Sequence, residues 1–147
     1  MRSGGGSGRE RFAAAALLGL FALAAGAGLV GDASVADEHP HILSGYLYWK
    51  SGRFAGGLDN PPLGQLAVAL PLVLSNRQYR FPSDENLWLC RLPVLLSGLL
   101  LGVVLWKWGR ALGGAAVGLL ALGGFALEPN LLAHGHLATL DFLVTVL

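Results

Sequence analysis

The uncharged run Phe12–Val30 limits what this chain can fold into more than any other feature of its sequence. Its 19 residues carry no charged side chain, and a helix of about 20 apolar residues is what crosses the ~30 Å hydrocarbon core of a bilayer. Three arginines lie in the preceding head, Met1–Arg11, which predicts a cytoplasmic N-terminus by the positive-inside rule. A cleaved signal peptide is the alternative. Its apolar region usually has about 7–15 residues, so the longer run here favours a retained membrane anchor.

The composition of the whole chain agrees with a membrane protein. Hydrophobic residues make up 54% and charged residues only 13%, against about 25% charged residues in ordinary soluble domains. The net charge of +1 offers no basic surface for nucleic acid, so nucleic acid is not an expected partner. The 22 glycines would loosen a soluble helix, whereas in a bilayer small residues allow helices to approach closely.

Further apolar runs predict an all-α, polytopic membrane protein. The short turn Lys107–Arg110 carries two positive charges and no acid, which is typical of a cytoplasmic turn between two spans. The predicted organisation is a disordered cytoplasmic head at 1–11 and a membrane domain at 12–147, with spans at about 12–30, 87–106 and 111–127, an outer loop at 31–86 and the start of a fourth span at 142–147. Six residues of helix reach only about 9 Å, so we expect the sequence to stop inside that fourth span.

The outer loop contains two apolar segments that are too short to cross a bilayer. Residues 42–52 place apolar and aromatic side chains at near-helical spacing, which predicts an amphipathic helix in the membrane interface that ends near Gly52. Residues 63–74 follow Pro61-Pro62 and predict a second, shorter interfacial helix, because their ~18 Å of helix cannot span.

Two acidic residues of the predicted outer side, Asp37 and Asp141, each lie beside a membrane helix. Polar residues gather in loops for unremarkable reasons, but an unpaired carboxylate at the edge of a bilayer is costly and therefore indicates function. By the predicted topology all four histidines and eight of the nine acids face the same side.

The order of the motifs resembles that of a known family. The chain has one span followed by Asp37-Glu38, then Asp59-Asn60-Pro61-Pro62-Leu63, Arg91-Leu92-Pro93, Pro129–His134 and Thr139-Leu140-Asp141. This order resembles the N-terminal part of the protein O-mannosyltransferase superfamily of GT-C glycosyltransferases, which includes the bacterial lipid A aminoarabinose transferase. The resemblance covers nearly everything after residue 11. It implies a GT-C-like set of membrane helices, a polyprenyl-phosphate-linked sugar donor, and transfer to an unidentified acceptor on the outer face of a bacterial inner membrane.

The resemblance also implies roles for single residues. Asp37 matches the catalytic base that would deprotonate the acceptor hydroxyl, Glu38 a neighbour that assists by orientation or metal contact, and Asp141 a second acidic position. Asn60 and His134 fall in motifs where substrate contacts are expected, although many relatives carry His or Lys in place of Asn60, and that departure puts the contact there in doubt.

Arg91 is a candidate partner for the donor phosphate, since a guanidinium can hold phosphate with two hydrogen bonds. The competing interpretation is an arginine whose stem lies along the bilayer while its head reaches the interface.

Two other classes of function fit the same residues. The pairs His39/His41 and His134/His136 could meet as a site for a zinc, copper or nickel ion, with Asp37 or Asp141 as an oxygen ligand. Glu38 and His39 are the single residues considered as candidate metal ligands. The chain could also be a small structural or assembly subunit of a membrane complex, without chemistry, in which the glycine-rich third span packs against other helices.

Overall fold

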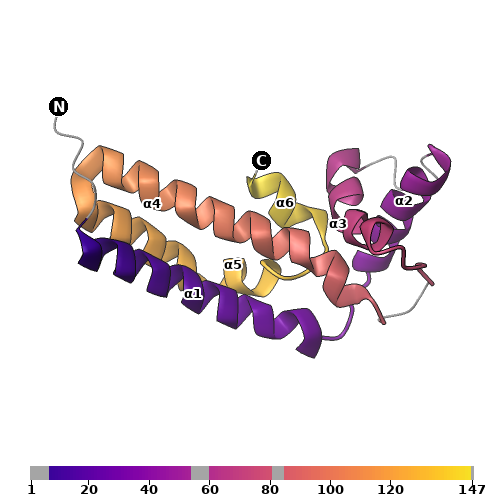
Figure 1. Cartoon of the computed structure of the whole chain (residues 1–147), viewed down its shortest axis with the longest axis horizontal. Helices are drawn as coiled ribbons and strands as arrows, with labels where there is room; N and C mark the ends of the chain where they lie inside the picture. Colours follow the sequence, from indigo (N-terminus) through magenta and orange to yellow (C-terminus); the bar gives the residue numbers. More distant parts are fainter. Residues whose placement is uncertain (1–6, 54–59, 81–84, 147) are drawn as a thin grey trace.

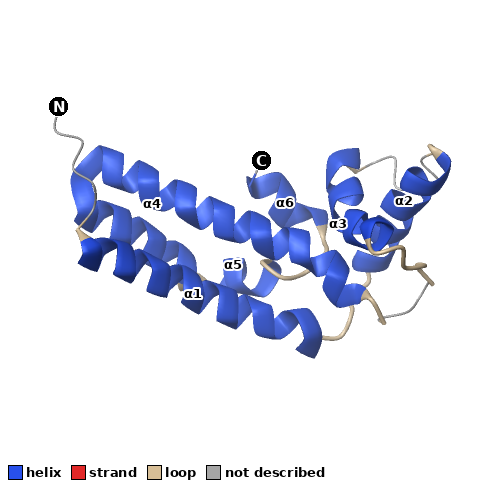
Figure 2. Ribbon diagram, in the orientation of Figure 1, coloured by secondary structure: helices blue, strands red, loops and turns tan. Residues whose placement is uncertain are grey.

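The computed structural model of the chain describes residues 7–53, 60–80 and 85–146, and within these ranges it contains helices and no strand (Figures 1 and 2). This confirms the all-α prediction. The elements in order are α1 Gly8–Gly31, α2 Glu38–Ser51, α3 Pro62–Leu74, α4 Leu87–Ala126, α5 Pro129–His134 and α6 Leu140–Val146.

Helix α1 contains the whole of the predicted first span and begins before it. Ser7 caps its N-terminus by accepting a hydrogen bond from the Glu10 backbone N–H at 3.3 Å, as serine commonly does at this position. The helix therefore starts at Gly8, and residues 8–11 of the predicted disordered head are helical. Residues 1–6 of that head lie outside the described part of the chain.

Helix α4 contains both of the next two predicted spans, and the predicted turn at Lys107–Arg110 is wrong. These residues are helical, and the non-helical break is at Gly113 and Gly114, where Gly114 has φ +81°, a conformation that favours glycine. The chain reverses there, so that the arm 87–112 lies beside the arm 115–126 (Figure 1). A Cβ on Gly109 would come within 3.0 Å of the Gly118 Cα, which shows how closely the two arms approach.

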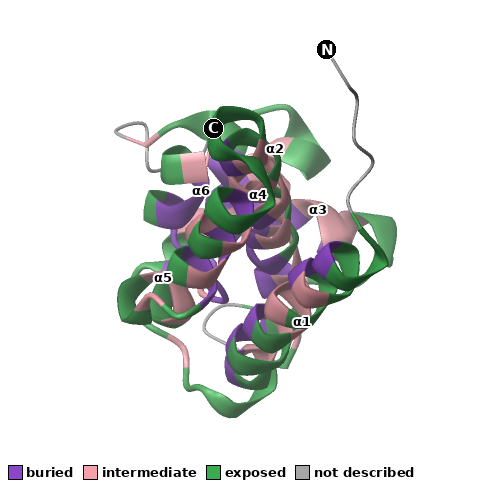
Figure 3. Ribbon diagram, turned by 90° about the vertical axis from the view of Figure 1, so that its left-hand side faces the viewer, coloured by how far each residue is buried: buried purple, intermediate pink, exposed green. Residues whose placement is uncertain are grey.

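The side chain of Phe21 joins α1 to both arms of α4. It is fully buried, its ring centroid lies 4.7 Å from that of Phe125 in the second arm, and a Cβ on Gly98 in the first arm would be 2.9 Å from it. Buried residues accordingly line the inward faces of the helices, and exposed residues line the outward faces (Figure 3).

The outward faces of α1 and α4 are apolar, unlike the surface of an ordinary soluble bundle. Both helices are long and apolar enough to cross a membrane. Their exposed large hydrophobic residues include Leu20, Leu23, Val30, Leu96, Leu100, Leu112 and Leu120. An apolar exterior of this kind is typical of a surface that contacts lipid or another protein.

Helices α2 and α3 pack against each other at one end of the α1–α4 bundle (Figure 1). A helix is therefore present at each of the two positions where an interfacial helix was predicted, although α2 begins at Glu38, four residues before the expected start. It ends at Gly52, whose φ of +69° closes the helix in the left-handed conformation, as predicted. A Cβ on Gly45 would collide with the Gln65 carbonyl, so the absence of a side chain at Gly45 permits this close packing.

Two short helices complete the described chain. The Glu128 carboxylate caps α5 by accepting a hydrogen bond from the Leu131 N–H at 2.6 Å. Helix α6 begins at Leu140, two residues before the predicted fourth span, and Asp141 therefore lies in its first turn. Residue 147 lies outside the described part.

Candidate functional site

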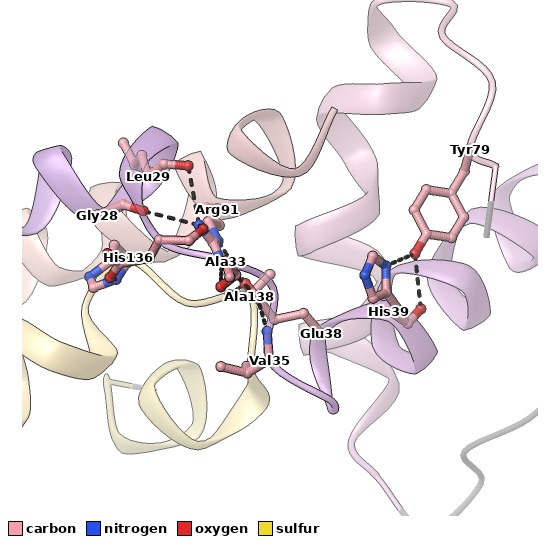
Figure 4. A network of polar contacts seen from close by, with 11 residues as sticks. Gly28, Leu29, Ala33, Val35, Glu38, His39, Tyr79, Arg91, His136 and Ala138 are labelled. Carbon is pink, nitrogen blue, oxygen red and sulfur yellow. Dashed lines mark hydrogen bonds and ion pairs between the residues drawn. The ribbon is translucent and has the colours of Figure 1, made fainter. Parts of the chain in front are cut away.

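A buried ion pair joins Glu38, at the start of α2, to Arg91, near the start of α4. The Arg91 Nε donates to Glu38 Oε1 and the Arg91 Nη2 donates to Glu38 Oε2, each at 2.8 Å (Figure 4). Both side chains have a relative exposure of 0%. Parallel hydrogen bonds of this kind are the strongest arrangement available to an arginine and a carboxylate.

Two backbone N–H groups also donate hydrogen bonds to the Glu38 carboxylate. Val35 donates to Oε2 at 3.0 Å, and Ala138 donates to Oε1 at 2.7 Å. Burial raises the pKa of Glu38, but the hydrogen bonds from Arg91, Ala138 and Val35 together with the Arg91 charge outweigh burial and hold the pKa below its ordinary value. Glu38 is therefore an ionised group inside the protein that ties the start of α2 to α4 and to the loop before α6.

Arg91 directs its remaining N–H groups at the C-terminal end of α1. Nη1 donates to the carbonyls of Gly28, Leu29 and Asp32 at 3.0, 3.2 and 2.9 Å, and Nη2 donates to the Ala33 carbonyl at 3.1 Å. The last carbonyls of a helix lack partners within the helix and favour a nearby positive charge. Arg91 supplies both the hydrogen-bond donors and the positive charge, and all its N–H groups face acceptors within the protein. This geometry does not support the predicted contact of Arg91 with a donor phosphate.

We call Glu38, Arg91 and the backbone groups that they bind the Glu38–Arg91 clip. The contacts within this clip also limit the roles that the Glu38 carboxylate can have. A carboxylate with four short contacts inside the protein is not placed to contact a metal ion or an acceptor, and the structure gives Glu38 a structural role in fixing its neighbour.

That neighbour, Asp37, has the opposite surroundings. It occupies the N-cap position of α2, its side chain makes no capping hydrogen bond, and it is exposed. Because the clip holds the following residue at both carboxylate oxygens, the backbone of Asp37 is fixed while its carboxylate is open to a ligand.

His41 lies close to both of the carboxylates predicted to be functional, Asp37 and Asp141. It lies one helical turn beyond Asp37 and is half-buried, and residues four apart share a face of a helix. Burial lowers the pKa of His41, and the negative charges of Asp37 and Asp141 oppose that shift. Both carboxylates therefore lie within electrostatic reach of one imidazole. From the sequence, Asp37 and Asp141 stood out, and His41 was considered only as a metal ligand beside His39, although its spacing from Asp37 was a usable signal.

A hollow of about 190 Å³ lies beside Asp141, between α5 and α6. Its polar lining comes from His134, Asn130, Thr145 and Asp141, so the structure brings His134 and Asp141 to the same hollow. Asn60 lies at the start of α3 and is half-buried. Within the described residues no contact joins Asn60 to this group.

The histidines do not come together as the metal hypothesis requires. The His39 ring contacts the Tyr79 hydroxyl at 2.5 Å, whereas the His136 Nε2 lies 2.8 Å from the Asp32 carboxylate at the end of α1. Across residues 7–53, 60–80 and 85–146 there is no group of three or more His, Cys, Asp or Glu side chains that could hold a metal ion. The metal-site prediction, with Glu38 and His39 as ligands, therefore has no support in the arrangement of these residues.

Comparisons of the chain with protein-family models, with curated proteins and with solved structures give no match.

Proposed function

We propose that these residues form the N-terminal part of a membrane glycosyltransferase that moves a sugar from a polyprenyl-phosphate-linked donor to an acceptor on the outer face of a bacterial inner membrane. The observation that carries the proposal is the pair of carboxylates at one end of the bundle. Asp37 and Asp141 are both exposed, lie more than one hundred residues apart in the sequence, and are both close enough to His41 for their charges to oppose the lowering of its pKa by burial.

In this reaction Asp37 is the general base. The acceptor hydroxyl oxygen forms a bond to the anomeric carbon of the sugar while the bond between that carbon and the phosphate oxygen breaks. The hydroxyl proton passes to the Asp37 carboxylate, and the lipid phosphate leaves with the bonding electrons. Because a proton must be accepted as the new bond forms, the base has to be ionised and within reach of the hydroxyl.

Asp141 and His134 supply contacts to the sugar or the acceptor in the hollow between α5 and α6. Carboxylate and imidazole groups are suitable partners for sugar hydroxyls because they accept and donate hydrogen bonds. The Glu38–Arg91 clip acts on the reaction through position alone, because it fastens both the residue before α2 and the loop before α6, at Ala138.

The apolar exterior of α1 and α4 supports a lipid-linked donor. A donor whose tail is a polyprenyl chain lies in the bilayer and presents its phosphate and sugar at the boundary. A carboxylate at the end of a membrane helix can therefore reach its sugar from a fixed position, with the N-terminus of the chain in the cytoplasm and the active face outside.

The substitution Asp37→Asn in the full-length protein tests the proposal. Asparagine keeps the size of the side chain but cannot accept the proton, and general base catalysis typically contributes about 10²–10⁴-fold. We expect turnover to fall by at least ~100-fold, with donor binding retained. The measurement is sugar transfer from a polyprenyl-phosphate donor in membranes, normalised for folded protein.

Asp32→Asn is the matched control, because it makes the same chemical change five residues earlier, at a carboxylate that contacts His136 rather than His41. Near-normal turnover in Asp37→Asn, or an equal loss in Asp32→Asn, would contradict the assignment of Asp37 as the base.

A further inference from the structure

A polar hollow lies at the N-terminal end of α4, apart from the group formed by Asp37, His41 and Asp141. It has a volume of about 290 Å³ and is lined by Arg77, Gln78, Arg80, Glu85 and Asn86. Two guanidinium groups and one carboxylate leave it with a net positive charge, and two side-chain amides add hydrogen-bond donors and acceptors.

The backbone fixes the position of Arg77 at this hollow. Helix α3 ends with Asn76 in the left-handed conformation, at φ +55°. The Asn76 N–H donates to the Val73 carbonyl at 3.1 Å, and the Arg77 N–H donates to the Leu72 carbonyl at 3.0 Å. These two bonds form a Schellman motif, which closes a helix C-terminus in a defined geometry. Arg77 is therefore not on a loose segment.

Side-chain contacts hold the rest of the lining. The Arg77 Nη1 donates to Asn86 Oδ1 at 2.7 Å, which uses one of the five N–H donors of that guanidinium. Tyr79, between the two arginines in sequence, contacts the His39 ring through its hydroxyl (Figure 4). The segment 77–80 is thus anchored both to α4 and to α2.

The N-terminus of α4 adds to the attraction for an anion. Asn86 is its N-cap residue, but the Asn86 side chain makes no capping bond to the helix because its oxygen accepts from Arg77. The first turn of α4 contains no acidic residue, so the positive end of the helix dipole adds to the charge of the two arginines, while the Glu85 carboxylate in the lining opposes both.

A second hollow beside the first one indicates that the anion is attached to a lipid. It has a volume of about 190 Å³ and shares Glu85 with the polar hollow. Its apolar lining comes from Leu29, Val30, Leu87 and Trp88, and its remaining lining from Asp32 and Arg91. Val30 and Trp88 are 81% and 40% exposed. A hollow with both apolar and polar lining next to a basic one, at the end of a membrane helix that carries a tryptophan, matches the boundary between acyl chains and headgroups.

We infer that the hollow formed by Arg77, Gln78, Arg80 and Asn86 binds the phosphate ester group of a membrane lipid. Guanidinium groups fit phosphate oxygens through paired hydrogen bonds. The inference requires the membrane placement of α1 and α4 but not sugar transfer. The same phosphate chemistry has two sources in a bilayer, the headgroup of a glycerophospholipid and a polyprenyl phosphate, and the two can be distinguished by experiment.

The test measures lipid binding to the full-length protein in detergent by native mass spectrometry, with phosphatidylglycerol and with polyprenyl phosphate as separate probes. Replacing a charged hydrogen-bond donor costs about tenfold in affinity, so Arg77→Gln with Arg80→Gln should weaken binding of the preferred lipid by at least ~10-fold. The tighter-binding probe identifies the source of the phosphate.

Arg53→Gln is the matched control, because Arg53 is an exposed arginine in the same outer segment that does not line the hollow. It should bind the lipid as the natural protein does. Equal binding by the double variant, or an equal loss in Arg53→Gln, overturns the inference. Arg77→Lys with Arg80→Lys keeps the charge but cannot form the paired hydrogen bonds, so it should recover only part of the affinity lost in the glutamine variant. Full recovery of the affinity in a folded lysine variant with the natural melting temperature overturns the assignment of the paired hydrogen bonds, because an ammonium group cannot form them.

Discussion

Two adjacent carboxylates at the start of α2 have opposite surroundings. Glu38 is fully buried, and both its oxygens are bound by Arg91 and by backbone N–H groups. Asp37 is exposed and makes no capping hydrogen bond. One residue of an acidic pair can therefore hold the backbone in place while the carboxylate of its neighbour stays exposed.

The largest effect should come from removing the positive half of the Glu38–Arg91 clip. Arg91→Met leaves the Glu38 charge buried without its ion-pair partner and removes the Arg91 hydrogen bonds to four carbonyls around the end of α1. Breaking a buried ion pair costs about 3–5 kcal/mol. We expect the free energy of unfolding to fall by about that amount. Chemical denaturation in detergent, followed by circular dichroism, measures it.

A double variant sharpens this prediction. Arg91→Met with Glu38→Gln removes both charges, so no unpaired charge remains inside the protein, and the loss should be smaller than the sum of the two single losses. Losses that simply add would mean that the two side chains do not act as a pair.

The next largest effect should be a decrease in the free energy of unfolding at acidic pH. Because the folded protein holds the Glu38 pKa below its ordinary value of 4.5, the unfolded chain takes up a proton at higher pH than the folded protein does. The stabilisation is therefore fully present above pH 4.5 and is lost as the pH falls below that value through the folded pKa. The free energy of unfolding should decline with acidification in this window. A Glu38→Gln variant should lose part of that dependence, and an unchanged slope would contradict the account.

The smallest effect should come from removing the second ion pair at the same end of the bundle, between Asp32 and His136. The Asp32 carboxylate contacts His136 at 2.8 Å, but its side chain is 59% exposed, and solvent weakens such pairs to about 0–1 kcal/mol. Asp32→Asn should lower the free energy of unfolding by less than ~1 kcal/mol. A loss comparable with that of Arg91→Met would show that this pair, and not the Glu38–Arg91 clip, fastens the loop before α6.

The helices of the fold could be predicted because their signals are local. A long apolar run, the paired prolines before α3 and the glycine that ends α2 each act on their own segment. The turn in α4 was misplaced for a physical reason. The charges of Lys107 and Arg110 indicate a side of the membrane but do not oppose helix, whereas the φ of +81° at Gly114 does require glycine.

The candidate site could be predicted only in part. Asp37 and Asp141 stand out because each carboxylate adjoins an apolar run. The pairing of Glu38 with Arg91, 53 residues apart, depends on how α2 packs onto α4, and no local pattern distinguishes a buried arginine in that position from one at the interface. The basic hollow around Arg77 and Arg80 was missed for the same reason, since Asn86 approaches Arg77 only after α3 and α4 are in place.

The most direct test of the account compares Asp37→Asn with Glu38→Gln in one preparation of the full-length protein, with the melting temperature and the turnover per folded molecule measured for both. The account predicts an unchanged melting temperature and at least a ~100-fold loss of turnover for Asp37→Asn. For Glu38→Gln it predicts a lower melting temperature and a smaller loss of turnover. A stable but inactive Glu38→Gln beside an active Asp37→Asn would contradict it.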